Sequence, residues 1–135
     1  MAETPAAVAD THALIFYASE DRRLGRGASA HFEGCEAGEK LLYVPAAAIL
    51  ECSLLVRTGK VDLRRSVRAF FDDLFSKAAF QPYDLTPGQI YLAEEIRFNR
   101  DPFDALICAA AMDLELPLLT RDDDIRASGR VRVVW

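Results

Sequence analysis

The sequence predicts a single α/β domain over residues 1–135, with helices flanking a mostly parallel central β-sheet. Short apolar runs alternate with helical segments along the chain, as expected where parallel strands are joined by helices. A length of 135 residues supports one domain with a hydrophobic core and is too short for two ordinary ones. Hydrophobic residues make up 51% and charged residues 27%, which is typical of a globular protein.

The first strand and helix are predicted near the N-terminus. Residues 6–9 form a short apolar run, which places Asp10 at the carboxyl end of a buried strand, and residues 13–18 follow as a short helix. Residues 20–40 are polar and contain four glycines. Any helix there is therefore expected to be interrupted and to face outward.

The second strand, residues 41–44, leads directly into a predicted helix. Pro45 opens this helix, which runs to Arg57 and stops at Gly59, a typical C-terminal signal. Residues 46–56 are almost all apolar, and Glu51 is the one charge among them. A carboxylate on such a face loses hydration unless a cation or hydrogen-bond donors meet it. Glu51 is therefore expected to have a partner.

Two helices and a strand are predicted in the next third of the chain. Residues 66–79 show the apolar spacing of an amphipathic helix, and residues 80–85 include a short strand. The stretch from Thr86 to Gln89 has the pattern of a capping box with proline in the first turn. A helix is therefore expected from there to about Phe98.

The central helix of the domain is predicted to begin at Pro102, with Asp101 as its N-cap. It is apolar on nearly every face and ends before Pro117, so it is expected to be buried. Strands are predicted at residues 118–120 and at residues 131–135. The two strands close the sheet.

Four carboxylates are predicted to meet at one edge of this sheet. Asp10 and Asp122 follow strands, Glu51 lies in the helix after the second strand, and Asp104 lies in the first turn of the buried helix. Ligands of open parallel sheets bind outside the carboxyl ends of the strands. Oxygen ligands without a cysteine or histidine cluster suit Mg²⁺ or Mn²⁺, which can activate water and stabilise charge on a phosphoryl oxygen. Acids at strand ends also form ordinary helix caps, and that alternative remains open for Asp101.

Charge and cysteine content narrow the class of protein. The net charge of −5 argues against binding nucleic acid by bulk electrostatics, although it does not exclude a nuclease with an acidic, metal-neutralised site. The three cysteines are odd in number and lack a CxxC spacing, as expected for reduced residues of a cytoplasmic protein. Neither a signal peptide nor an apolar run long enough to span a bilayer is seen.

Three stretches of the chain resemble the signature motifs of one family. Residues 8–14 read Val-Ala-Asp-Thr-His-Ala-Leu, residues 100–107 read Arg-Asp-Pro-Phe-Asp-Ala-Leu-Ile, and residues 118–122 read Leu-Leu-Thr-Arg-Asp. In this order they resemble the motifs of PIN-domain proteins of the VapC-type toxin subfamily, and Glu51 matches that family's helical acid. The resemblance extends over essentially the whole chain, including the closing Val-Val-Trp.

The resemblance implies a PIN-like domain that acts as an endoribonuclease with Mg²⁺ or Mn²⁺. The acids carried over as catalytic and metal-binding residues are Asp10, Glu51, Asp104 and Asp122. Asp122 is chosen over the adjacent Asp123 and Asp124 because it lies two residues after Thr120, and a role for either neighbour stays open. Thr120 is implied as a polar supporter of the pocket, and Asp101 as a further acid or only the cap. Residues 46–48 are all alanine where many relatives have Ser or Thr, so the polar lining of the pocket differs here.

The same resemblance implies the partners and the products. Proteins of this kind cleave RNA to leave a 5′-phosphate and a 3′-hydroxyl, are held inactive by a small antitoxin, and form homodimers. We therefore expect an RNA substrate, a cognate antitoxin and a homodimer, without membrane association.

Two other functions remain open from the sequence. A catalytically degenerate PIN domain would act as an RNA- or protein-binding module, although all four acids are present. A phosphoryl-transfer enzyme would use Asp10 as nucleophile, but a companion lysine at a strand end is not evident.

Several basic and histidine residues are not assigned a role in catalysis. A basic strip comprises Arg57, Lys60, Arg64, Arg65 and Arg68. The strip fits RNA phosphates, a solvated face or an acidic partner. His12 is interpreted as a packing residue, and His31 is expected on the surface.

Overall fold

The computed structural model describes residues 5–135, and every strand pair in its single five-stranded sheet is parallel, which confirms the predicted α/β fold. The strands are β1 (Ala6–Ala9), β2 (Leu41–Pro45), β3 (Phe80–Tyr83), β4 (Leu118–Leu119) and β5 (Val133–Val134). The helices are α1 (Thr11–Ala18), α2 (Arg26–Glu36), α3 (Ala46–Arg57), α4 (Val67–Phe75), α5 (Pro87–Ile96), α6 (Pro102–Leu114) and α7 (Asp123–Ser128).

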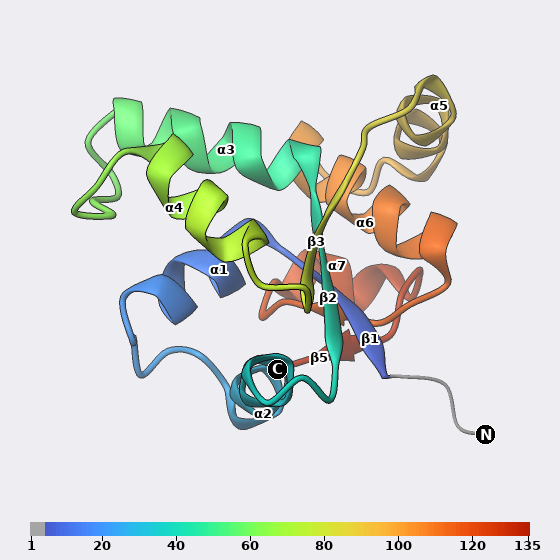
Figure 1. Ribbon diagram of the computed structural model, residues 1–135. Coiled ribbons are helices and arrows are strands. Elements are labelled where there is room, and N and C mark those ends of the chain that lie inside the picture. The colour runs from blue at the N-terminus through green and yellow to red at the C-terminus, as the bar shows by residue number, and fades with distance from the viewer. Residues whose placement is uncertain (1–4) are drawn as a thin grey trace.

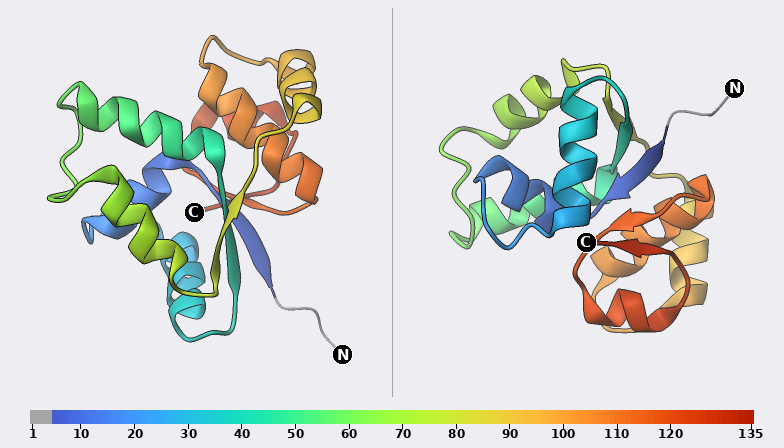
Figure 2. Two further views of the ribbon diagram at one scale, coloured as in Figure 1. Left: turned by 45° about the horizontal axis from the view of Figure 1, so that its top comes forward. Right: turned by 90° about the horizontal axis from the view of Figure 1, so that it is seen from below.

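The order of strands across the sheet is β3-β2-β1-β4-β5. The chain therefore moves outward from β1 to β3 in one direction and then crosses back to place β4 on the other side of β1. Right-handed crossovers put the helices of these two halves on opposite faces of the sheet. Figures 1 and 2 show α1, α2 and α4 on one side and α5, α6 and α7 on the other. Helix α3 lies across the top of Figure 1, where β2 ends.

The strand order reverses between β1 and β4, which makes their carboxyl ends the switch point of the sheet. Val8 pairs with Leu118 and Ala9 pairs with Leu119, so Asp10 and Thr120 emerge side by side. Ligands of open α/β sheets bind in the crevice at such a switch point. The topology thus selects this edge as the place to look for a site.

Helix α6 is the most deeply buried helix segment, as its apolar sequence predicts. Ile107 and the run Cys108–Ala111 are at most 1% exposed. Small alanine side chains allow α6 to approach both α5 and β1 closely. The helix ends at Glu115, which adopts a left-handed conformation with φ of 55°. The opposite end of α6, its N-terminus, lies at the switch-point edge.

The polar segment before β2 differs from its prediction. It contains a continuous helix, α2, whose inner face packs against β2, so the expected interrupted, outward-facing helix is wrong. His31 is only 8% exposed, and its Nε2 lies 2.7 Å from the carbonyl oxygen of Leu41, so the expected surface position is also wrong. Phe32 and Cys35 are buried on the same face.

Smaller differences concern the ends of helices. The short helix α7 was not predicted, and α4 ends at Phe75 rather than near residue 79. Thr86 accepts a hydrogen bond from the Gln89 backbone N–H at 3.2 Å, but the Gln89 amide donates to the Asp84 carbonyl at 2.9 Å. Only one half of the capping box is therefore formed.

Within residues 5–135, the helices are all too short or too polar to cross a membrane.

Candidate active site

The predicted acids lie together in a cavity of about 260 Å³ at the switch-point edge, which we call the acidic pocket. The pocket is lined by Asp10, Thr11, His12, Glu51, Asp101, Asp104, Ile107, Arg121 and Asp122. These side chains come from the start of α1, from α3, from the start of α6 and from the link between β4 and α7. The structure thus brings together all four predicted acids and Asp101.

Asp10 is held at the base of the pocket by two hydrogen bonds. It is 8% exposed and caps α1, where its Oδ1 accepts from the Ala13 N–H at 2.9 Å. Its Oδ2 accepts from the hydroxyl of Thr120, which is fully buried and in turn accepts from the Asp122 N–H at 3.1 Å. Burial raises the pKa of Asp10, and the hydrogen bonds from Thr120 and Ala13 oppose that rise. Thr120 therefore couples two of the predicted acids.

Glu51 has the hydrogen-bond donor that its apolar surroundings require. The Thr11 hydroxyl donates to Glu51 Oε1 at 2.5 Å, which joins the start of α1 to α3. Desolvation nevertheless raises the pKa of Glu51, and the nearby Asp101 adds to the rise. Sequence reasoning missed Thr11 as this donor because the contact joins residues 40 positions apart.

Asp104 is oriented by Asn99, which the sequence did not single out. The Asn99 amide donates to Asp104 Oδ2 at 2.9 Å and to Asp124 Oδ2 at 3.3 Å. Its own oxygen accepts from the Asp101 N–H at 3.0 Å. Burial raises the pKa of Asp104 to about 7, and the charges of Asp101, Asp122 and Glu51 contribute, against the opposing hydrogen bond from Asn99. A partly protonated carboxyl at neutral pH marks a functional-site candidate.

Asp101 and Asp122 each cap a helix whose N-terminus faces the pocket. Asp101 accepts from the N–H groups of Phe103 at 2.9 Å and Asp104 at 3.4 Å, which confirms its predicted role as the cap of α6. Asp122 accepts from the Ile125 N–H at 2.9 Å at the start of α7. Helix N-termini favour negative charge, so these starts help to hold carboxylates together.

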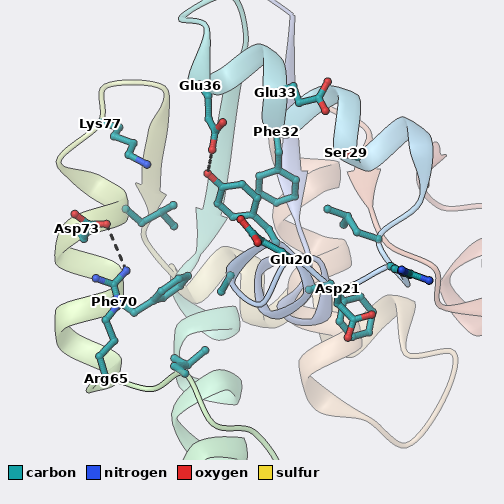
Figure 3. A pocket seen from close by; sticks show the side chains of 17 residues that line it. Glu20, Asp21, Ser29, Phe32, Glu33, Glu36, Arg65, Phe70, Asp73 and Lys77 are labelled. Atoms are coloured by element: carbon teal, nitrogen blue, oxygen red, sulfur yellow. Dashed lines mark hydrogen bonds and ion pairs between the residues drawn. The ribbon is translucent and has the colours of Figure 1, made fainter.

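The acids of this pocket form no ion pairs with the described part of the chain. None of the ion pairs found within residues 5–135 involves any of its five carboxylates. The larger cavity of about 620 Å³ between α1, α2 and α4, shown in Figure 3, is different. There Tyr17 donates to Glu36, and Asp73 pairs with Arg65 at 3.4 Å. Three basic side chains line the larger cavity, whereas within residues 5–135 Arg121 alone lines the acidic pocket, so the uncompensated acids mark the smaller pocket as the candidate site.

The donor chemistry of the acidic pocket fits a hard divalent cation. Its carboxylate and hydroxyl oxygens are the ligands that Mg²⁺ and Mn²⁺ prefer. Within residues 5–135, no three carboxylate, imidazole or thiol groups lie close enough together to coordinate an ion without some movement of the side chains. The three cysteines are buried, and desolvation raises the pKa of each thiol to about 11, so a thiolate site is disfavoured.

These features define a parallel α/β protein with an acidic pocket at the switch point of its sheet. The family model described as the PIN domain matches residues 7–130. The chain therefore belongs to the PIN-domain family, whose members are generally nucleases, and the resemblance stated from the sequence motifs is confirmed. No curated protein sequence matches the chain significantly.

Solved structures share the fold at low sequence identity. A chain of VapBC2 from Rickettsia felis bound to a promoter DNA fragment aligns with a TM-score of 0.67 and 12% identity, covering 95% of this chain and 96% of that one. A toxin–antitoxin complex from Klebsiella pneumoniae aligns with a TM-score of 0.61 and 19% identity, covering 93% and 94%. FitAcB from Neisseria gonorrhoeae aligns with a TM-score of 0.57 and 18% identity, covering 94% and 95%. These similarities show the fold.

Proposed function

We propose that this protein is a metal-dependent endoribonuclease that hydrolyses RNA phosphodiester bonds at the acidic pocket, and that it is the toxin of a type II toxin–antitoxin pair. The observation that supports the proposal best is that five carboxylates meet at the switch point of a PIN-domain sheet and that none of them has an ion-pair partner among residues 5–135. Such a set of like charges is costly unless protons or a cation neutralise it.

The proposed ligands of Mg²⁺ or Mn²⁺ are the predicted acids Asp10, Glu51, Asp104 and Asp122. When bound, the metal would activate water and stabilise negative charge on the phosphoryl oxygens. The chain itself orients the ligands through hydroxyl and amide donors, which come from Thr120 for Asp10, Thr11 for Glu51 and Asn99 for Asp104. Such donors to ligating groups fix the orientation of a site.

The raised pKa values link metal binding to pH. Burial raises the pKa of Asp10, Glu51 and Asp104, so the metal-free pocket retains protons that a cation must displace. Metal affinity is therefore expected to rise with pH up to about 7, the pKa of Asp104. The expected products carry a 5′-phosphate and a 3′-hydroxyl.

We also propose that the protein forms a homodimer and that a cognate antitoxin binds it and keeps it inactive. One solved structure with the same fold is described as a toxin–antitoxin complex, which supports the antitoxin. Static light scattering of the purified chain should give twice the monomer mass. A monomer mass at all concentrations would contradict the homodimer.

Cleavage of RNA by the purified chain tests the function. Total bacterial RNA is incubated with the protein and Mg²⁺ or Mn²⁺, and we expect discrete fragments that EDTA abolishes. The isosteric variants Asp10→Asn, Glu51→Gln, Asp104→Asn and Asp122→Asn should each remove most activity.

Asp113→Asn is the matched control, because Asp113 is exposed at the far end of α6 and accepts from Tyr83 there. It should cleave like wild type. RNA bound but uncut with every metal would instead support a binding module, and full activity of the Asp104→Asn variant would remove Asp104 from the site.

A further inference from the structure

Among residues 5–135, Arg121 is the one lysine or arginine that lines the acidic pocket. Its guanidinium carbon lies 4.8 Å from the centre of the Phe16 ring, and Arg121 belongs to none of the ion pairs found within residues 5–135. An arginine that neutralised the pocket would pair with a carboxylate through two parallel hydrogen bonds, because the two planar groups match. Arg121 instead packs on an aromatic ring, which leaves its donors available for another anion.

A second cavity of about 520 Å³ adjoins the acidic pocket, since His12 lines both. Phe16 lines this second cavity, and the guanidinium carbons of Arg121 and Arg23 lie 4.8 and 4.5 Å from the centre of its ring. Three basic and two acidic side chains line the second cavity, whereas one basic and five acidic ones line the acidic pocket. Arg23 already pairs with Asp21 at 2.8 Å, so the remaining charges of the second cavity balance, in contrast to the strongly acidic pocket on the other side of His12.

In the structure, the residues of the basic strip predicted from the sequence differ in whether they form ion pairs. Arg65 and Arg68 form ion pairs with aspartates of α4, at 3.4 and 3.6 Å. Lys60 and Arg64 form none within residues 5–135, and both line the second cavity. Lys60 and Arg64 are therefore the residues of the basic strip that could extend a path of cationic side chains beginning at Arg121.

We propose that Arg121 binds a phosphate of the RNA strand beside the bond that is cleaved, and that the strand continues past His12 toward Lys60 and Arg64. The inference rests on the proposed ribonuclease function. The planar guanidinium fork binds phosphate oxygens in pairs, and the exposed cations add affinity that does not depend on sequence. Phe16 is 3% exposed, so it orients Arg121 through a cation–π contact and does not stack with a base.

Steady-state cleavage of the RNA fragment that the wild-type protein is found to cut tests this path. With Mn²⁺ at 50 and 200 mM KCl, Arg121→Ala should lower kcat/KM about 10- to 100-fold, mainly through KM, because a charge-assisted contact is lost. The slope of log(kcat/KM) against log[salt] should become shallower by about 0.7 for the lost phosphate contact. Arg121→Lys should recover part of the loss, and Lys60→Ala combined with Arg64→Ala should raise KM.

Arg132→Ala is the matched control, because this exposed arginine precedes β5 at the opposite edge of the sheet and loses the same charge. It should keep the wild-type KM and salt slope. Wild-type KM and salt slope in Arg121→Ala, together with tighter Mn²⁺ binding, would show that Arg121 is a counter-ion of the acids and overturn the inference. If the wild-type protein cuts no RNA, the proposed function fails as well, so the two failures are distinguishable.

Discussion

Asp101 shows that one side chain can cap a helix and line the acidic pocket at once. If capping is its main role, Asp101→Ser should keep both stability and cleavage, because serine also caps well. Asp101→Ala should lower the free energy of unfolding by about 1 kcal/mol. Urea denaturation and RNA cleavage of both variants check this. Loss of cleavage by a fully stable Asp101→Ser variant would place Asp101 among the metal ligands.

Asn99 is predicted to tune metal binding through Asp104. Within the described part of the chain, its amide supplies the one side-chain hydrogen bond to that carboxyl, and removing it lets burial raise the pKa of Asp104 further. Asn99→Ala should therefore weaken Mn²⁺ binding roughly 10- to 100-fold, as is usual for partners of metal ligands. Isothermal titration calorimetry with Mn²⁺ measures the change. An unchanged dissociation constant would mean that Asp104 is either oriented without Asn99 or is not a ligand.

The acids and the supporting Thr120 could be predicted from the sequence, whereas the partners Thr11 and Asn99 could not. A carboxylate after a strand, or alone in an apolar helix, is visible as a break in a pattern, and Glu51 is the clearest case. Thr11 and Asn99 break no pattern, because a threonine at a helix start and an asparagine in a loop are both ordinary. Only the packing of α1 against α3 and of the loop before α6 gives them partners.

Helix α2 was mispredicted because its glycines were interpreted as helix breaks. In the fold they are sites of close approach. A Cβ on Gly34 would lie 2.5 Å from the Lys40 side chain, and one on Gly25 would lie 2.1 Å from the Trp135 carbonyl oxygen. Glycine there is selected by tertiary contacts that local propensity does not contain. Helix α7 escaped prediction for another reason, since six residues are too few to show a helical period.

Gly25 is predicted to be essential for docking the C-terminal residues onto α2. The Ala28 N–H donates to the Trp135 carbonyl at 3.0 Å, and a Cβ on Gly25 would collide with that backbone oxygen. Gly25→Ala should therefore lower the free energy of unfolding by about 1–3 kcal/mol. Gly88→Ala is the control, because its Cβ would meet only Thr86 Oγ1 at 3.8 Å, and it should be neutral or stabilising. Chemical denaturation of both variants decides; equal stabilities would refute the docking role.

At the scale of the whole molecule, the metal-free protein is predicted to lose stability as pH rises from about 4 to about 7. The folded-state pKa of Asp104 is about 7, above the ordinary value of 3.8. In that window the unfolded chain is ionised while the native pocket still holds a proton, so the unfolded state gains relative stability as pH increases. His31, whose pKa burial lowers, acts in the opposite direction near neutral pH. The difference in free energy of unfolding between wild type and Asp104→Asn therefore separates the contribution of Asp104 from that of His31.

Urea denaturation in EDTA at a series of pH values measures this effect. Relative to wild type, Asp104→Asn should become progressively more stable as pH rises through the window, since it removes the group that must ionise. Asp113→Asn should follow wild type at every pH. A constant difference between wild type and the Asp104→Asn variant from pH 4 to 8 would contradict the raised pKa.

Most of the fold could be predicted because its strands and its buried helix coincide with hydrophobic runs of the sequence. The apolar stretches of β1, β2 and α6 stand out in the sequence, and the alternation of strands and helices implies a parallel sheet. The order of strands is not encoded locally. It depends on which strands pair across the sheet, so the switch point between β1 and β4 emerged only from the structure.

The central claim is that the acidic pocket binds a divalent cation through the predicted acids, and thermal melting with and without Mn²⁺ tests it most directly. Wild type, Asp104→Asn and Asp113→Asn are each melted in EDTA and in Mn²⁺. A ligand that binds only the folded state stabilises it by about 2.7 kcal/mol at a hundred times its dissociation constant. Asp104→Asn should melt higher than wild type in EDTA and gain less from Mn²⁺, whereas Asp113→Asn should match wild type. If Asp104→Asn melts lower in EDTA and gains as much from Mn²⁺ as wild type, Asp104 is not a metal ligand and the account of a shared metal pocket is wrong.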